Sequence, residues 1–284
     1  MTWWVLALIS AAAAAATGIL AKIGVHGVPS NLATALRTVV VIVFAWVMVL
    51  VSGQLDFSVL SGRSLLFLGL SGIATGLSWL AYFRALDLAP ASRVAPIDKS
   101  SLGLTIILAG VVLAEPIGLP VAIGAALIVA GALITIDWSR SAKGERGWWV
   151  FAALAALFAA ATAILAKIGI EGVPSNLATA LRTVVVLVFA WGIVLARHEH
   201  RALASISRRS LLFLGLSGLG TGISWLCYYA ALSLAPASSV APIDKASLAL
   251  TIVLAAIFLK ERITLRLAIA VVLITGGAML TLLH

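Results

Sequence analysis

Ten apolar runs, each about long enough to cross a lipid bilayer as a helix, determine what this chain can fold into. A membrane-spanning helix needs about 20 consecutive apolar residues. The first half has five such runs, at about residues 3–24, 30–52, 64–86, 90–113 and 117–136. The second half has five more, at about 148–169, 175–197, 210–232, 236–259 and 263–283. Because 63% of the residues are hydrophobic and only 10% are charged, the chain is too apolar for a soluble globular protein. The sequence predicts an all-α polytopic membrane protein with ten transmembrane helices.

The two halves of the chain are copies of each other. Residues 20–46 and 165–191 differ at only three positions, which identifies an internal duplication. Because each copy has an odd number of spans, the second copy enters the membrane from the face opposite to the first. We predict two inverted five-helix repeats, at residues 1–136 and 148–284, joined by a linker at 137–147.

The distribution of basic residues predicts the orientation of the chain. Its net charge of +9 does not indicate nucleic-acid binding, because the Lys and Arg residues lie in short connections between apolar runs. Most of these Lys and Arg residues lie at one face of the predicted bundle, and the other face receives only Arg63 and Lys167. Basic loops stay in the cytoplasm, so we expect a cytoplasmic linker and external termini, in a bacterial-type inner (plasma) membrane.

The pentapeptide Ala-Pro-Ile-Asp-Lys occurs at the front of the fourth run in both copies, at residues 95–99 and 241–245. Its proline removes a backbone donor inside the predicted helix, and in hydrocarbon such irregular backbone persists only where it faces protein or a water-lined cavity. We therefore assign Pro96 and Pro242 a helix-breaking or gating role. An ionisable residue inside a membrane costs about 2.5–3.5 kcal/mol, so the acid and base that follow each proline predict a functional site.

Four ionisable residues of each copy lie within apolar sequence. They are Lys22, Arg37, Asp98 and Lys99 in the first copy, and Lys167, Arg182, Asp244 and Lys245 in the second. Each set has three bases and one acid, so internal pairing leaves a positive charge that an anionic or zwitterionic substrate would neutralise. We predict that both arginines, with Lys99 and Lys245, bind the negative group of the substrate. The two aspartates would orient these bases or accept a proton.

Other interpretations of these residues stay open. Lys22 and Lys167 lie near helix ends, where a lysine can extend its ammonium to the membrane surface. The arginine and aspartate of each copy are alternatively a structural ion pair. The aromatic residues of the third runs either line a cavity or mark the membrane interface. They are Trp79, Tyr82, Trp225, Tyr228 and Tyr229.

No catalytic motif accompanies these residues. The sequence has no G-x-S-x-G, no Walker loop and no H-E-x-x-H, which disfavours both an enzyme and an ATP-driven pump. Its single cysteine, Cys227, excludes an internal disulfide and a cysteine-rich metal site. We expect no cofactor and no metal, and a monomer or a homodimer.

Several features together resemble EamA-domain proteins of the drug/metabolite transporter superfamily. They are the two five-helix copies, the run A-P-A-S-x-V-A-P-I at residues 89–97 and 235–243, the glutamates Glu115 and Glu261 that close the fourth runs, and the glycine-rich last runs. The resemblance covers essentially the whole chain. It implies ten helices around a central cavity and secondary transport, often export, of small metabolites or amino acids. Ten-helix members usually keep their termini in the cytoplasm, which differs from the orientation that the charges predict here. We expect Glu115 and Glu261 to cap or brace the last helix of their own half.

We therefore predict a secondary active transporter, an exporter or exchanger, of a small polar anionic or zwitterionic metabolite such as an amino acid. A proton or another ion would drive it. One alternative is a cationic-drug exporter, which predicts an acid in the cavity without a neutralising base. The first run lacks the membrane acid of small multidrug exporters, which disfavours this alternative. The other is a non-transporting membrane assembly or sensor, which predicts solid packing between the halves.

Overall fold

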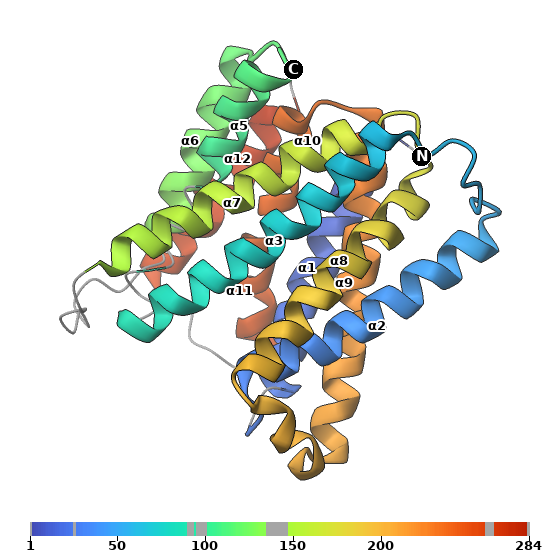
Figure 1. The fold of residues 1–284 in the computed structure, drawn as a ribbon. Coiled ribbons are helices and arrows are strands. Elements are labelled where there is room, and N and C mark those ends of the chain that lie inside the picture. The colour runs from blue at the N-terminus through green and yellow to red at the C-terminus, as the bar shows by residue number, and fades with distance from the viewer. Residues whose placement is uncertain are drawn as a thin grey trace.

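The computed structural model describes residues 2–24, 27–89, 94, 101–134, 147–258 and 264–282, and every regular element in these ranges is a helix (Figure 1). The first copy contains α1 (Trp3–Gly24), α2 (Ser30–Val51), α3 (Gly62–Leu88), α5 (Ser101–Val112) and α6 (Leu119–Ile134). The second contains α7 (Trp148–Gly169), α8 (Ser175–Ala196), the short 3-10 helix η2 (Glu199–Ser205), α9 (Arg208–Leu234), α10 (Ala237–Lys245), α11 (Ser247–Phe258) and α12 (Leu265–Thr281).

Seven helical segments in the described ranges are long and apolar enough to cross a membrane. They comprise α1, α2, α3, α7, α8, α9 and the segment that joins α10 to α11. The described parts of the remaining predicted runs contain shorter apolar helices, α5, α6 and α12. The prediction of an all-helical membrane protein is therefore confirmed, and seven of its ten predicted spans have the length that a crossing requires.

The fourth run of the second copy is broken into two helices. Pro242 lies inside α10, which ends at Lys245, and α11 begins at Ser247. At the junction the Ala246 amide donates to the Ile243 carbonyl at 3.0 Å, a tighter turn than that of an α-helix. The break places Asp244 and Lys245 at the end of a short helix. The equivalent Pro96, Asp98 and Lys99 lie outside the described residues.

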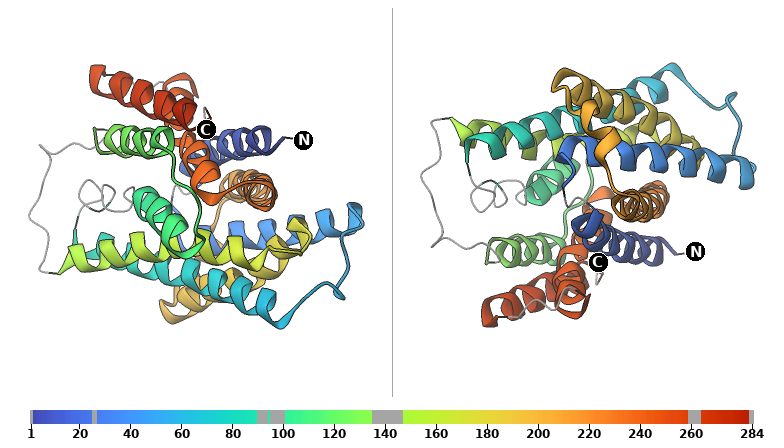
Figure 2. Two further views of the ribbon diagram at one scale, coloured as in Figure 1. Left: turned by 90° about the horizontal axis from the view of Figure 1, so that it is seen from above. Right: turned by 90° about the horizontal axis from the view of Figure 1, so that it is seen from below.

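The most extensive helix pairs join one copy to the other. They are α3 with α7, α1 with α9, α6 with α12 and α2 with α8. Figure 2 shows α6 beside α12 and α3 beside α7 from both ends of the bundle. The largest hydrophobic cluster likewise mixes the copies, with Ala7 and Leu68 from the first and Ile164, Leu177 and Leu232 from the second. The core of the protein is thus an interface between its two halves.

Glycines bring α6 and α12 into backbone contact. A Cβ atom added to Gly124 would lie 2.5 Å from the Gly277 carbonyl oxygen, and one added to Gly277 would lie 2.5 Å from the Gly124 carbonyl oxygen. Two turns further along α6, Gly131 faces Ala270 and Ile274, so α6 and α12 run antiparallel. Small residues permit such close approach between helices in membranes.

Long polar side chains from one copy cap helices of the other. The Glu199 carboxylate accepts from the Leu32 amide at 3.2 Å and from Asn31 Nδ2 at 2.6 Å, at the start of α2. At the start of α8, the Asn176 amide donates to Gln54 Oε1 at 3.2 Å. Gln54 and Glu199 occupy equivalent positions of the two copies. Each cap thus satisfies an amide that has no partner within its own helix.

Glu115 caps α10 of the other copy, a contact that the sequence did not indicate. Its carboxylate oxygens accept from the backbone amides of Ala237 at 2.8 Å and Ser238 at 2.9 Å, at the start of α10 in the second copy. The expectation that Glu115 supports the last helix of its own half was therefore wrong. The free amides at the start of α10 offer a carboxylate both hydrogen bonds and the positive end of a helix dipole. Glu261 lies outside the described residues.

Candidate functional site

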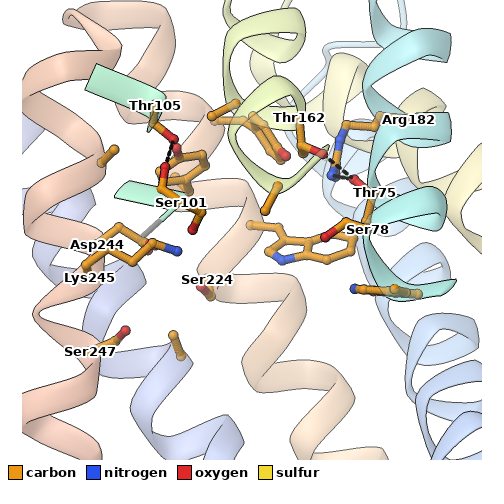
Figure 3. Close-up of a pocket in the computed structure, with 18 residues that line it drawn as sticks. Thr75, Ser78, Ser101, Thr105, Thr162, Arg182, Ser224, Asp244, Lys245 and Ser247 are labelled. Carbon is orange, nitrogen blue, oxygen red and sulfur yellow. Dashed lines mark hydrogen bonds between the residues drawn. The ribbon is translucent and has the colours of Figure 1, made fainter. Parts of the chain in front are cut away.

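Most of the predicted site residues in the described ranges line one of two adjoining cavities between the copies. The first, which we call the Arg182 cavity, has a volume of about 390 Å³. Its polar and aromatic lining consists of Thr75, Ser78, Trp79, Ser101, Thr105, Thr162, Arg182, Ser224, Trp225, Tyr228, Tyr229, Asp244, Lys245 and Ser247 (Figure 3). The second, the Arg37 cavity, has a volume of about 360 Å³.

Arg182 lies two turns into α8, is only 2% exposed and is held on several sides. Its Nε donates to Ser71 Oγ at 3.0 Å, and its Nη2 donates to Thr75 Oγ1 at 2.5 Å. Its guanidinium carbon also lies 5.0 Å from the ring centroid of Trp225 and 4.9 Å from that of Tyr229. Such ring faces attract a cation. The guanidinium is therefore fixed in position by α3 on one side and α9 on the other.

One nitrogen of this guanidinium has no hydrogen-bond acceptor. Within the described part of the chain, Arg182 Nη1 is buried and has no hydrogen-bond acceptor. Buried donors in proteins are almost always paired, and a charged donor left unpaired is costly. Because Arg182 lines the cavity and one of its donors lacks an acceptor, Arg182 is a candidate for binding an anionic group.

Asp244 and Lys245 lie on the opposite wall of the Arg182 cavity (Figure 3). Asp244 Oδ1 accepts from Ser10 Oγ of α1 at 2.8 Å, and Ser10 in turn lies 3.1 Å from Ser224 Oγ. In the part of the chain that the structure describes, no ion pair joins Arg182 to Asp244. The two residues face each other across the cavity because hydroxyl groups hold each of them on its own wall.

Arg37 reproduces part of this arrangement in the other cavity. Its Nη2 donates to Thr221 Oγ1 at 2.8 Å, and Thr221 is the residue of the second copy that corresponds to Thr75 of the first. Arg37 Nε is buried without a hydrogen-bond partner among the described residues. Thr17, Thr34 and Thr38 line the same cavity. Asp98 and Lys99 fall outside the described residues, as does the side chain of Lys22.

The predicted aromatic residues line the cavities rather than the outer surface. Trp79 and Trp225, which are equivalent in the two copies, line both cavities. Tyr82 lines the Arg37 cavity, and Tyr228 and Tyr229 line the Arg182 cavity. Of the two interpretations left open by the sequence, the structure thus favours cavity lining for all five residues. The pair of tryptophans lies where the two cavities adjoin.

Lys167 is placed apart from the Arg182 cavity. Its Nζ donates to the carbonyl oxygens of Leu232 at 2.5 Å and Ala235 at 2.6 Å, at the end of α9. These carbonyls have no partner within the helix, and an ammonium there is favoured by the helix dipole. Lys167 thus supports the turn between α9 and α10.

Sequence analysis missed the hydroxyl groups that position the charges. Ser71, Thr75 and Thr162 form a connected group, because Ser71 Oγ donates to the Thr162 carbonyl at 2.8 Å and the hydroxyls of Thr75 and Thr162 lie 3.3 Å apart. The sequence did contain one indication of these hydroxyl groups. Ser71 and Thr75 are four residues apart on α3, hence on one face, and the pair recurs as Ser217 and Thr221.

Known proteins are similar to this chain in sequence or in fold. A sequence model of the EamA-like transporter family matches residues 1–136 and again residues 146–283. A curated protein of Sinorhizobium sp, named "Uncharacterized transporter in cobO 3'region", is 48% identical over 134 residues, which are 47% of this chain and 95% of that protein. A solved crystal structure with 19% sequence identity superposes with a TM-score of 0.79 over 98% of this chain and 96% of that chain, which is a likeness of fold.

Proposed function

Because the chain belongs to the EamA-like transporter family, we propose that it is a secondary active transporter of a small anionic or zwitterionic metabolite, such as an amino acid. Membership of the family makes it an integral membrane transporter of a small molecule. The class of substrate is inferred from the charges of the Arg182 cavity. The buried guanidinium of Arg182, with Nη1 left unsatisfied among the described residues, carries this inference.

A negative group on the substrate would pair with Arg182. An arginine that is desolvated by burial is stabilised by an anion at hydrogen-bond distance, and a guanidinium presents donors that match a carboxylate. Ser71 and Thr75 fix the orientation of this fork before the substrate arrives. Such preorganisation reduces the entropy that binding costs.

The opposite wall supports a zwitterion. Asp244 offers a carboxylate and Lys245 an ammonium in the same cavity, so a substrate carboxylate at Arg182 and a substrate ammonium near Asp244 would match both walls. The volume of about 390 Å³ lies at the lower end of the range for small-molecule sites. We accordingly favour substrates of the size of an amino acid. Lys99 and Asp98 would supply the corresponding charges from the first copy.

We further propose that the copies are inverted repeats that exchange access between the two faces of the membrane. This proposal is supported by the antiparallel packing of the equivalent helices α6 and α12, and by the equivalent contacts of Arg182 with Thr75 and of Arg37 with Thr221. The break between α10 and α11 beside the cavity is also typical of transporters of this kind. The units would be residues 1–136 and 148–284, with the linker at 137–147 in the cytoplasm.

The remaining details of the proposal follow from the same residues. Pro242, and by equivalence Pro96, would act as a hinge beside the substrate. Asp244 would accept a proton if proton movement drives transport. We place the protein in a bacterial inner membrane, as a monomer or a homodimer.

The two alternative functions have less support. A membrane assembly without transport predicts solid packing between the copies, whereas both cavities lie between them. A cationic-drug exporter predicts a cavity acid without a base, whereas Arg182 and Lys245 line the cavity that contains Asp244.

Thermal-shift screening of the purified protein tests the proposal. Anionic and zwitterionic metabolites should raise the melting temperature of the unmodified protein, because a ligand that binds the native state stabilises it. The same compounds should have a smaller effect on an Arg182→Gln variant. Stabilisation by cationic compounds alone, unchanged in that variant, would contradict the proposal.

A further inference from the structure

The Arg37 cavity adjoins the Arg182 cavity and contains a charge of its own. It has a volume of about 360 Å³ and is lined by α1, α2, α3 and α9. Among the described residues that line it, Arg37 is the only charged one. Because a guanidinium stays protonated in proteins, this cavity contains a permanent positive charge.

Arg37 has one buried donor without a hydrogen-bond acceptor among the described residues. Thr221 Oγ1 accepts from its Nη2 at 2.8 Å, while its Nε is buried and without a partner among the described residues. A purely structural arginine would be expected to have its buried donors paired. Thr34 and Thr38, on the same helix, add hydroxyl groups to the same cavity.

The two cavities meet at the tryptophans. Trp79, Trp225, Ala14 and Ser224 line both, and the remaining lining residues belong to one cavity only. Arg182 is absent from the lining of the Arg37 cavity, and Arg37 is absent from the lining of the Arg182 cavity. The two arginines thus line different cavities, and these cavities adjoin at the shared residues.

We infer that the Arg37 cavity is a second binding site for the anionic group of the substrate, distinct from the Arg182 cavity and reached across Trp79 and Trp225. The inference rests on the proposed function, because it takes the ligand at Arg37 to be the one that Arg182 binds. A substrate would then pass from one arginine to the other, and each arginine is positioned by a threonine of the opposite copy.

The single cysteine of the chain permits a test that needs no identified substrate. Cys227 is replaced by Ser, and Thr34 is then replaced by Cys as a reporter in the Arg37 cavity. The reaction rates of this thiol with an anionic methanethiosulfonate (ethylsulfonate) and a cationic one (ethyltrimethylammonium) are compared in detergent. Thr34 is three residues from Arg37 on α2, so the two side chains are neighbours at about 5–6 Å.

The ratio of anionic to cationic rates should depend on Arg37. A positive charge at that distance in water favours the anionic reagent over the cationic one by about tenfold, so Arg37→Gln should lower the ratio about tenfold while Arg182→Gln leaves it unchanged. In the protein with Arg37 intact, molar KCl should reduce the ratio by screening. An unchanged ratio in Arg37→Gln, no effect of salt, or no reaction with either reagent would overturn the inference.

Methanesulfonate tests occupancy of the site itself. An excess of this anion should slow modification of the Thr34→Cys thiol, with the protection lost in Arg37→Gln and retained in Arg182→Gln. Absence of protection would overturn the inference. A matched reporter, Thr162→Cys, tests the Arg182 cavity, where protection should depend on Arg182 instead. Failure of this second reporter alone would count against the proposed function and not against the site at Arg37.

Discussion

Arg182 of the second copy donates a hydrogen bond from Nη2 to Thr75 Oγ1 of the first copy at 2.5 Å. The position of a charge in one half is therefore set by a hydroxyl in the other. Since Arg37 and Thr221 repeat this contact with the copies exchanged, neither half forms a complete cavity by itself.

Replacing Thr75 by Val should weaken substrate binding about tenfold or more. Valine keeps the shape of threonine but removes the acceptor, and a hydrogen bond to a charged group contributes about 1.5–3 kcal/mol. The dissociation constant for a metabolite that stabilises the unmodified protein provides the measurement. Thr75→Ser, which keeps the hydroxyl, serves as the control. Equal affinities of the valine variant and the unmodified protein would show that Thr75 does not position Arg182 for binding.

Replacing Lys245 by Met should abolish transport in proteoliposomes and leave the protein folded. Methionine has a similar length but no charge, so the wall opposite Arg182 loses its ammonium while its packing is retained. We expect the same of Lys99→Ala from the equivalence of the copies. Arg63→Met removes an exposed charge from the first turn of α3 and should transport normally. Full activity of Lys245→Met would remove this lysine from the site.

Replacing Glu115 should lower the melting temperature, by an amount that depends on how many acceptor oxygens the new side chain keeps. Its carboxylate accepts two backbone amides of α10, and loss of such a cap costs about 0.5–2 kcal/mol. Glu115→Gln keeps one acceptor oxygen and should show a smaller decrease in melting temperature than Glu115→Ala. Glu171 is exposed and lines an outer pocket together with Glu115. It gives a matched control, since Glu171→Ala should leave the melting temperature nearly unchanged. Equal effects at the two glutamates would contradict the capping role.

Replacing Gly124 or Gly277 by Ala should destabilise the protein by similar amounts. In either variant the new Cβ would lie 2.5 Å from a carbonyl oxygen of the facing helix, so α6 and α12 must separate, and such overpacking costs about 1–3 kcal/mol. Gly276 is the neighbour of Gly277 but has no atom within 4 Å of an added Cβ. Gly276→Ala should therefore be neutral or stabilising, because alanine favours helix. Thermal unfolding in detergent distinguishes these outcomes. A Gly124→Ala variant with the melting temperature of the unmodified protein would contradict the observed close contact.

Much of the fold and part of the site could be predicted from the sequence. The family predicted from the repeated motifs is confirmed, and the helix bounds follow the apolar runs closely in α1, α2, α7 and α8. The run that contains Pro242 is broken, although α10 continues through Pro242 and the break lies at Ala246, beyond the acid and base. These features are local, so composition and spacing are sufficient to find them.

Contacts between distant residues could not be predicted in the same way. The partners of Arg182 on α3, and the cap that Glu115 provides to α10, join residues more than 100 positions apart. Which side chains meet across two helices depends on the rotation of each helix and on the packing of all the others. For this reason the sequence indicated the charges of the site but not the hydroxyl groups that position them.

The packing of α2 against α8 limits how the two copies can evolve. Each of these helices packs on the other and on the third helix of the opposite copy, so two nearly identical surfaces must fit two nearly identical partners. A mutation in one copy therefore meets an unaltered partner in the other. The near identity of residues 20–46 and 165–191 keeps these interfaces matched. Loops that meet no counterpart are free to diverge.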